Sequence, residues 1–449
     1  MYTEKTSNRI LSVVALTIVL FFFLTIGVRT FTRQVLVKHF GITNAFTNVV
    51  LFDRKGLSEA SAGGTINWAE LYPFYHQAAE TTPQITIQHF SGLKKKIDTI
   101  KSNVETYVTD FLIGYDLMTQ WERVYRNVIH WNFVPYSEYN GIIKMSDGYL
   151  TNIVPSGDVS EQVASAVELS SFCAEQGADF LYIQAPHKIC KVTDTTLSGS
   201  TDFSNQNADS LLAGLSGAGL ETLDLREVLH QEQLSHHELF YRTDHHWKAE
   251  TGLWASKHIL QELNSRYGFH SSPDLLNDDR FKKVVYPSWF LGSQGKKVTL
   301  AQTTPEDISL LYPDYPTQLH FLLPSKNLDI EGDFSILYNM DAIEECDYMS
   351  KNPYSAYAYG DQPLEQITNP SSNENRKILL IHDSFSDCVI PFLALGLRNV
   401  DAIDLRHFTG SLQCYIASSC PDIVVVMYNC GATGKAIDRT THKDLFDFR

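Results

Sequence analysis

The chain has 449 residues, of which 43% are hydrophobic and 12% aromatic, so it can build two or three domains with a sizeable core. Its formal net charge of −16 argues against nucleic acid as a partner and disfavours a strongly anionic polymer, because like charges repel. A neutral or weakly charged substrate fits this balance better.

An apolar run near the N-terminus, from Ile10 to Val28, contains no charged residue. As a helix it would extend about 28 Å and cross a bilayer once. A cleaved signal peptide is the alternative, but its apolar region is usually about 7 to 15 residues and no small-x-small cleavage site follows Val28. We expect a transmembrane anchor over 10–28, a cytoplasmic tail over 1–9 and the rest of the chain outside the cell, although basic residues flank the run on both sides.

Residues 29–135 predict a helical stalk or subdomain, with a long helical stretch from about 87 to 129. Its triplet Lys94-Lys95-Lys96 is better explained as a solvated helix face than as a lipid-binding site, because one triplet carries little affinity. After Gly148 strands alternate with helices, which indicates an α/β domain with a parallel sheet, and we place this domain over 136–449. Residues from about 270 to 375 interrupt this alternation and predict an irregular or β-rich insertion that could cover a site. The expected strands are 179–183, 220–223, 378–381, 400–403 and 423–427, and the clearest helices are 162–176 and 248–266.

The seven cysteines include no CxxC pair, which argues against a zinc ribbon or a thioredoxin-like site. A disulfide between Cys430 and either Cys414 or Cys420 is compatible with an extracellular location.

Three of the apolar strands end in polar residues, which predicts a ligand site because parallel sheets bind ligands beyond the carboxyl ends of their strands. Ser384 follows one strand, Asn429 follows another, and Arg406 stands two residues beyond Asp404 at the third. A serine at such a turn exposes its hydroxyl, and the backbone N–H groups that follow it, including that of Phe385, could hold an oxyanion. The simpler alternatives are that Asp383 or Ser384 only caps the next helix and that Asn429 is a turn residue.

A second segment, Tyr241 to Trp247, supplies the missing parts of a charge system. Asp244 and His246 lie two positions apart, so on a short extended stretch both side chains would project from one side, as a base and its orienting carboxylate. Ser384, His246 and Asp244 therefore predict acyl transfer or hydrolysis. His245 should point the other way, as a packed histidine or a substrate contact, and Trp247 is more typical of a core residue.

The histidines between 230 and 246 raise the alternative of a metal site. Neither an HExxH helix nor a Cys/His ligand spacing is present, and we expect neighbouring histidines not to reach one ion easily, so we predict no metal and no cofactor.

Four ordered motifs resemble the DHHW family of bacterial extracytoplasmic proteins, which is itself similar to the SGNH-like domains of the alginate O-acetyltransferases. The resemblance covers roughly residues 145–430. Two departures are His382 before Asp383, where Gly or Lys is commoner, and Ser386-Asp387 in place of a small residue and Asn. The motifs are Thr243–Trp247, Trp289–Ser293, Ile378–Leu395 and Ile403–Arg406.

This resemblance implies an SGNH-hydrolase-like three-layer α/β/α fold with a mostly parallel sheet over residues 136–449 and a Ser384–His246–Asp244 triad. Phe385, Asn429, His245 and Arg406 would bind the oxyanion or the substrate. The implied activity is O-acetyl transfer to or from a cell-surface polysaccharide, with the acyl group supplied by a membrane-bound O-acyltransferase. A catalytically silent glycan-binding or scaffold component of an export complex is the alternative, and a metal-dependent hydrolase is a weaker one.

Overall fold

The computed structural model describes residues 142–449, apart from 146, 192–200, 299, 301 and 442. These residues belong to one structural unit, which begins at Arg126. The tail, anchor and stalk expected over 1–9, 10–28 and 29–135 lie outside the described residues and stay predictions. Within the part of the chain that is described, no helix is long and apolar enough to cross a membrane.

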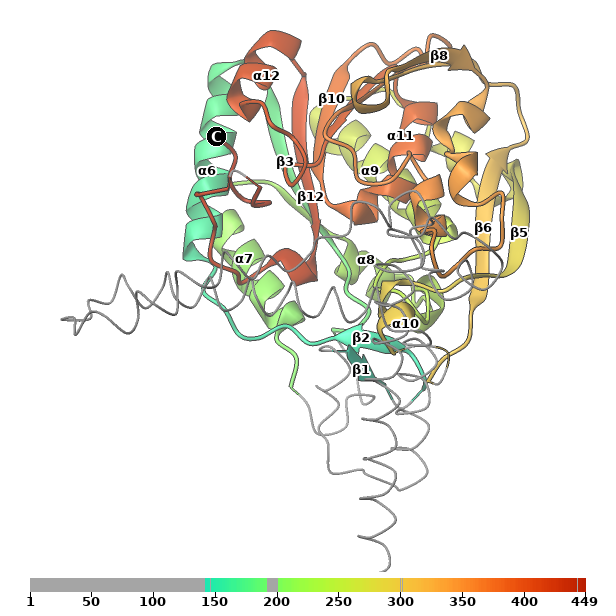
Figure 1. The fold of residues 1–449 in the computed structure, drawn as a ribbon. Helices are drawn as coiled ribbons and strands as arrows, with labels where there is room; N and C mark the ends of the chain where they lie inside the picture. Colours follow the sequence, from blue (N-terminus) through green and yellow to red (C-terminus); the bar gives the residue numbers. More distant parts are fainter. Residues whose placement is uncertain (1–141, 146, 192–200, 299, 301, 442) are drawn as a thin grey trace, which may run out of the picture. The chain divides into compact units, whose positions relative to one another are not determined.

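An eight-stranded mixed sheet runs through the described unit in the order β4-β3-β12-β10-β11-β9-β7-β8 (Figure 1). The first five strands of this order are parallel, as the alternation of strands and helices predicts. Their carboxyl ends therefore meet at one edge of the sheet, where Asp383 follows β10 and Asn429 ends the neighbouring β12. The parallel strands are β4 (Thr222–Asp224), β3 (Asp179–Ala185), β12 (Ile423–Asn429), β10 (Lys377–His382) and β11 (Asn399–Ile403).

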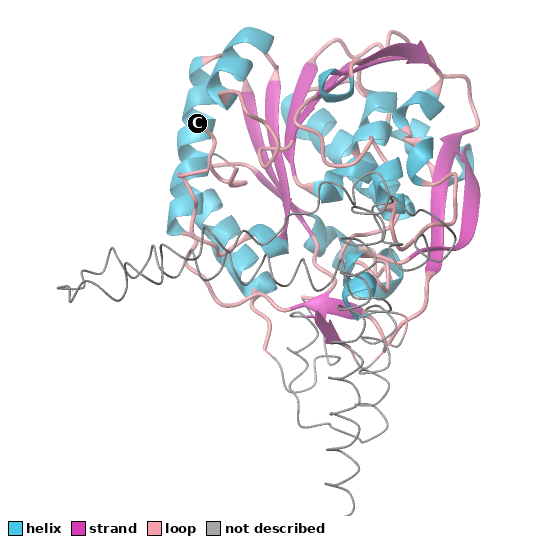
Figure 2. Ribbon diagram, viewed as in Figure 1, coloured by secondary structure: helices cyan, strands magenta, loops and turns pink. Residues whose placement is uncertain are grey.

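Both faces of the parallel strands are buried, which explains their nearly continuous apolar sequences. In β3, Leu181 and Ile183 face one hydrophobic core, whereas Phe180 and Tyr182 face another. This alternation follows from the two-residue period of a strand. Helices cover both faces, so the chain folds as the predicted three layers (Figure 2). The first core contains α9 (Ala249–Tyr267) and α11 (Ile390–Gly396), and the second contains α6 (Ser160–Glu175), α7 (Ser204–Gly217) and α12 (Leu412–Ser419).

The insertion predicted at about 270–375 is β-rich and joins the central sheet instead of only covering it. Three of its strands pair antiparallel beyond β11, which makes the sheet mixed where we predicted a mostly parallel one. The other two form a separate antiparallel ribbon, at the right in Figure 1. Its strands are β5 (Phe281–Phe290), β6 (Glu306–Pro313), β7 (Leu319–Leu323), β8 (Leu328–Gly332) and β9 (Glu365–Thr368), with helix α10 (Ser293–Val298) between β5 and β6.

The predicted helix over 248–266 is confirmed as α9, and Gly268 ends it in the left-handed conformation with φ 65°. In that conformation its N–H bonds back to the carbonyl of Leu263, which suits glycine because it lacks a Cβ. The remaining α-helix and strands of the described residues are α8 (Leu225–Gln231), β1 (Ile142–Lys144) and β2 (Leu150–Asn152).

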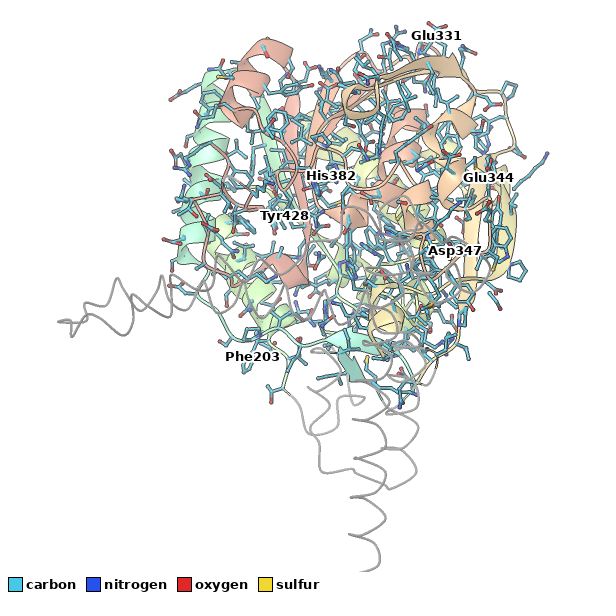
Figure 3. The ribbon with its side chains drawn as sticks, viewed as in Figure 1. Phe203, Glu331, Glu344, Asp347, His382 and Tyr428 are labelled. Carbon is cyan, nitrogen blue, oxygen red and sulfur yellow. The ribbon has the colours of Figure 1, made fainter. Side chains whose placement is uncertain are left out.

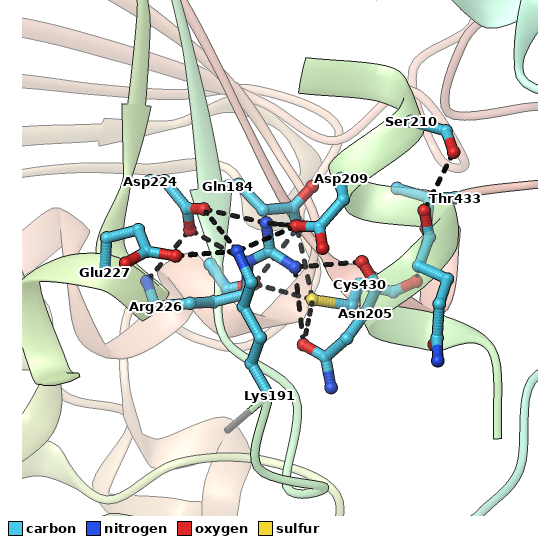
Figure 4. A network of polar contacts seen from close by, with 12 residues as sticks. Gln184, Lys191, Asn205, Asp209, Ser210, Asp224, Arg226, Glu227, Cys430 and Thr433 are labelled. Carbon is cyan, nitrogen blue, oxygen red and sulfur yellow. Dashed lines mark hydrogen bonds and ion pairs between the residues drawn. The ribbon is translucent and has the colours of Figure 1, made fainter. Parts of the chain in front are cut away.

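Polar side chains lie both inside the unit and at its surface, and some of the buried ones form networks. His382 and Tyr428, at the ends of neighbouring strands, are fully buried, whereas Glu331 and Glu344 lie exposed at the periphery (Figure 3). Beyond β4, the buried Arg226 pairs with the carboxylates of Asp224 at 2.7 Å and Asp209 at 2.8 Å (Figure 4). A buried guanidinium needs such partners because an unpaired charge in the interior is costly.

The seven cysteines, all within the described part, form no disulfide. The suggested bridge between Cys430 and Cys414 or Cys420 is wrong. Cys430 is buried, with its Sγ atom 3.4 Å from the carbonyl oxygen of Ala185, whereas the other two are exposed. The closeness of these cysteines in the sequence therefore does not bring their thiols together in the fold.

Glu365 on β9 is fully buried, and neither of its carboxylate oxygens has a hydrogen-bond partner among the described residues. Burial, with the negative charges of Asp404 and Asp361, raises the pKa of Glu365 well above its usual value. The folded state therefore binds this proton more tightly than the unfolded state. Its contribution to stability is complete below the ordinary glutamate pKa of about 4.3 and is lost as the pH rises through the folded pKa.

Glu365→Gln is therefore expected to raise the melting temperature at pH 7.5 by at least about 2 °C, while changing it little at pH 4. The amide is neutral at both pH values, so it removes the cost of ionising a buried carboxyl. Thermal denaturation of both proteins at the two pH values measures the difference, with the exposed Glu331→Gln as the control. An equal shift at both pH values would contradict the explanation.

Candidate active site

Ser384 lies two residues after the end of β10, at the first position of a short 3-10 helix, Ser384–Cys388. Asp383 caps this helix, because its Oδ1 accepts the N–H of Phe385 at 3.0 Å. The capping alternative therefore applies to Asp383 and not to Ser384. The Oγ of Ser384 instead lies 2.6 Å from Nε2 of His246.

Asp244 and His246 lie in a tight loop immediately before α9. The N–H of Tyr241 donates to the carbonyl of His246 at 3.1 Å, and Phe240 pairs with Trp247, so the loop is closed at its base. Oδ1 of Asp244 lies 2.5 Å from Nδ1 of His246. The structure thus brings Ser384 to Asp244 and His246, although Ser384 lies 138 positions after His246 in the sequence.

The contacts of His246 define where its proton lies. An ionised carboxylate only accepts hydrogen bonds, so Nδ1 must carry the hydrogen and Nε2 is left as the acceptor for the hydroxyl of Ser384. Burial opposes ionisation of Asp244, but His245, His246 and the N–H of Ser293 together hold its pKa well below the usual value. Asp244 is therefore ionised, and His246 is oriented to remove a proton from Ser384.

The segment after β5 holds the other side of Asp244, a role that reasoning from the sequence missed. The N–H of Ser293 donates to Oδ2 of Asp244 at 2.5 Å, and the N–H of Gly292 donates to Oγ1 of Thr243 at 2.9 Å. A Cβ on Gly292 would come within 2.2 Å of the Cβ of Asp244, so only glycine allows this approach. The motif Trp289–Ser293 was the available signal, but only the resemblance pointed to it.

Aromatic side chains fix the ring of His246. Tyr354 stacks on it with ring centroids 4.0 Å apart and an angle of 10°, and its hydroxyl donates to the carbonyl of Ser384 at 3.2 Å. Trp247 is fully buried, as predicted, and its indole N–H donates to the carbonyl of Phe385 at 2.7 Å. The base and the serine are thus held by packing from the core, which favours a pre-organised arrangement.

The two candidate oxyanion donors are both bound to Asp383. The N–H of Phe385 donates to Oδ1 as the helix cap, while the side-chain amide of Asn429 donates to Oδ2 at 2.6 Å and its main-chain N–H at 2.8 Å. A primary amide has two hydrogens, so Asn429 retains a second one for a ligand. The oxyanion roles of Phe385 and Asn429 stay predictions.

We predicted that His245 points away from His246, and this prediction is wrong. Its ring lies against that of His246, with centroids 3.7 Å apart, and its Nδ1 is 3.3 Å from Oγ of Ser293. The loop bends at these residues and is not an extended strand, so the two-residue alternation does not apply. The side chain of His245 remains 42% exposed, which leaves a substrate contact open to it.

Arg406 forms ion pairs with Asp404 and Asp361, the latter at 2.7 Å. Among the contacts of the described residues, none joins Arg406 to Ser384, His246 or Asp244. Arg406 is therefore not part of the group of residues that the fold assembles around Ser384. Its substrate-binding role stays a prediction.

Two groups of side chains in the described part have ligand atoms close enough for a metal ion, within 4.8 Å of one another. One is Asp244, His245 and His246, so the expectation that neighbouring histidines do not easily reach one ion does not hold for this geometry. In this group Nδ1 of His246 is bonded to Oδ1 of Asp244, and Nε2 of His246 is bonded to Oγ of Ser384. The other group is Asp361, Asp404 and His407.

The comparisons with known proteins concern the fold of this domain. Residues 146–277 match the family model described as the SGNH hydrolase-like domain of the acetyltransferase AlgX. No curated protein matches the chain.

Two solved structures share the fold. PatB1 of Bacillus cereus, solved with a sulfonyl adduct, is 19% identical with a TM-score of 0.56, covering 69% of this chain and 98% of its own. A DHHW family protein from Eubacterium siraeum is 14% identical with a TM-score of 0.53, covering 66% of this chain and 93% of its own. The resemblance predicted from the four motifs is thereby confirmed, and the chain contains an SGNH hydrolase-like α/β domain.

Proposed function

We propose that this protein is a serine-dependent O-acetyltransferase or acetylesterase that acts outside the cytoplasm on a cell-surface polysaccharide. The observation that carries the proposal is that two short contacts connect Asp244, His246 and Ser384. Oδ1 of Asp244 lies 2.5 Å from Nδ1 of His246, and Nε2 of His246 lies 2.6 Å from Oγ of Ser384. Such a series activates a hydroxyl as a nucleophile.

In the proposed mechanism His246 removes the hydroxyl proton of Ser384 while Oγ of Ser384 attacks the carbonyl carbon of an acyl ester. The tetrahedral intermediate collapses, the bond to the leaving oxygen breaks, and His246 returns the proton to that oxygen. A sugar hydroxyl or water then attacks the acyl-serine in the same way and releases Ser384. Exclusion of water during the second step would favour transfer over hydrolysis.

The comparisons support this class of reaction. The matched family model bears the name of an acetyltransferase, and the PatB1 structure carries a sulfonyl adduct. Sulfonyl electrophiles attach to activated nucleophiles, and Ser384 is the group in this chain that such chemistry would select. We propose, in addition, a single-pass anchor over 10–28 and an acyl group delivered by a membrane-bound O-acyltransferase.

Covalent labelling of Ser384 by a fluorophosphonate is the test that separates an enzyme from a silent component. We expect the purified full-length protein to gain one adduct, located on the peptide that contains Ser384 by mass spectrometry. The reaction should require the native fold, because heat-denatured protein lacks the base beside the hydroxyl. His246→Ala should slow the labelling for the same reason.

An unlabelled native protein would count against the enzyme and favour the glycan-binding or scaffold alternative. One observation favours that alternative: Asp383 already binds both predicted oxyanion donors, the N–H of Phe385 and the amide of Asn429. Labelling of residues other than Ser384 would equally reject the proposed nucleophile.

A further inference from the structure

A buried lysine lies directly behind the loop that carries Asp244 and His246. Lys188 follows β3 by three residues and is only 1% exposed. Its ammonium group donates to the main-chain carbonyl of Asp244, to that of Leu150 at 2.6 Å and to Oε1 of Gln294 at 3.2 Å. None of these acceptors is a carboxylate, so the amine, when protonated, places its charge among neutral oxygens.

The three acceptors match the three hydrogens of a protonated amine, whereas a neutral amine has only two to give. Burying a lysine in this way is costly, and an apolar residue of similar volume would fill the space at less expense of free energy. The presence of a lysine therefore points to a need for the charge or for its three hydrogen bonds.

The acceptors of Lys188 belong to three segments, of which one is the loop of Asp244 itself. Leu150 is in β2, Asp244 is in the loop before α9, and Gln294 is in α10 next to Ser293. The N–H of that Ser293 holds Oδ2 of Asp244. Lys188 thus fixes the main chain of Asp244 and, through α10, the N–H that orients its carboxylate.

The charge of Lys188 also favours the ionised state of Asp244, on which the proton position of His246 depends. Burial lowers the pKa of Lys188 to about 7, against the opposing charges of Asp244, Glu306 and Asp147. Further titratable groups near Lys188 are Tyr149, whose ring centroid lies 5.8 Å from Nζ, His245 and the neighbouring His187.

We propose that Lys188 is a positioning residue for the acyl-transfer reaction, and that its ammonium group holds the Asp244 loop so that the carboxylate meets Nδ1 of His246. This inference rests on the proposed function. It concerns a residue that touches no substrate and acts only through Asp244.

Lys188→Met in the full-length protein tests the proposal, with turnover of p-nitrophenyl acetate and the rate of fluorophosphonate labelling as readouts. Displacing Asp244 should lower kcat and the labelling rate by about 10- to 100-fold while KM changes less than about twofold. Lys191→Met is the matched control, because Lys191 is three residues away and pairs with Asp209 and Glu227 near the surface. It should retain the wild-type rates.

The pH dependence of the wild-type labelling rate gives a second readout that does not depend on the variant folding. The rate should fall as Lys188 loses its proton above about pH 7, because the neutral amine cannot satisfy three acceptors, and Lys188→Met should lack this decline. A flat wild-type profile from pH 6 to 9, or unchanged kcat in folded Lys188→Met, would overturn the inference. A wild type that is not labelled at all would instead reject the proposed function.

Discussion

Ser384→Ala is expected to lower acetyl-ester turnover by at least about 10³-fold. Among the described residues, the hydroxyl is the group that hydrogen-bonds Nε2 of His246, at 2.6 Å. Without it no acyl-serine can form, although binding and the surrounding dipoles remain. Release of p-nitrophenol from p-nitrophenyl acetate by the full-length protein measures the loss.

Ser386→Ala is the matched control. Ser386 lies in the same short helix and is fully buried, but its hydroxyl has no hydrogen-bond partner among the described residues. We expect this variant to keep the wild-type rate within about twofold, since small changes that break no contact have small effects. An active Ser384→Ala enzyme would refute the role of the serine, and equal loss in both variants would indicate damage to the helix instead.

Asp244→Asn is expected to lower kcat by about 10⁴-fold, as replacement of the triad carboxylate does in a serine protease. The two oxygens of Asp244 accept from opposite sides, Oδ1 from His246 and Oδ2 from the N–H of Ser293. An amide has only one oxygen. If that oxygen faces His246, the amide nitrogen opposes the N–H of Ser293, and if it faces Ser293, the amide hydrogens force the proton of His246 onto Nε2.

In the second orientation Nε2 can no longer accept the proton of Ser384, so chemistry stops while the fold is kept. The measurement is kcat together with circular dichroism. Asp333→Asn is the control, because Asp333 also accepts a main-chain N–H, that of Ser335, but lies at an exposed site. Wild-type kcat in Asp244→Asn would show that the carboxylate does not orient the base.

The sequence predicted the parallel half of the sheet well because those strands carry their own local signal. Residues 378–381 and 423–427 are apolar without interruption, since both faces of these strands are buried. The three antiparallel strands of the insertion are shorter and separated by turns and 3-10 helices, so their membership of the central sheet was not visible locally. Pairing of β9 with β11 depends on residues more than thirty positions apart.

By itself the sequence determined which residue types are available for the chemistry: a serine where an apolar strand ends, and a carboxylate and an imidazole two positions apart before a helix. The tertiary structure alone decided that these groups meet, that Ser293 and Lys188 support Asp244 from two other segments, and that no disulfide forms. The reason is physical. Helix, strand and cap signals act over a few neighbouring residues, whereas a hydrogen bond across 138 positions depends on the register and packing of the whole sheet.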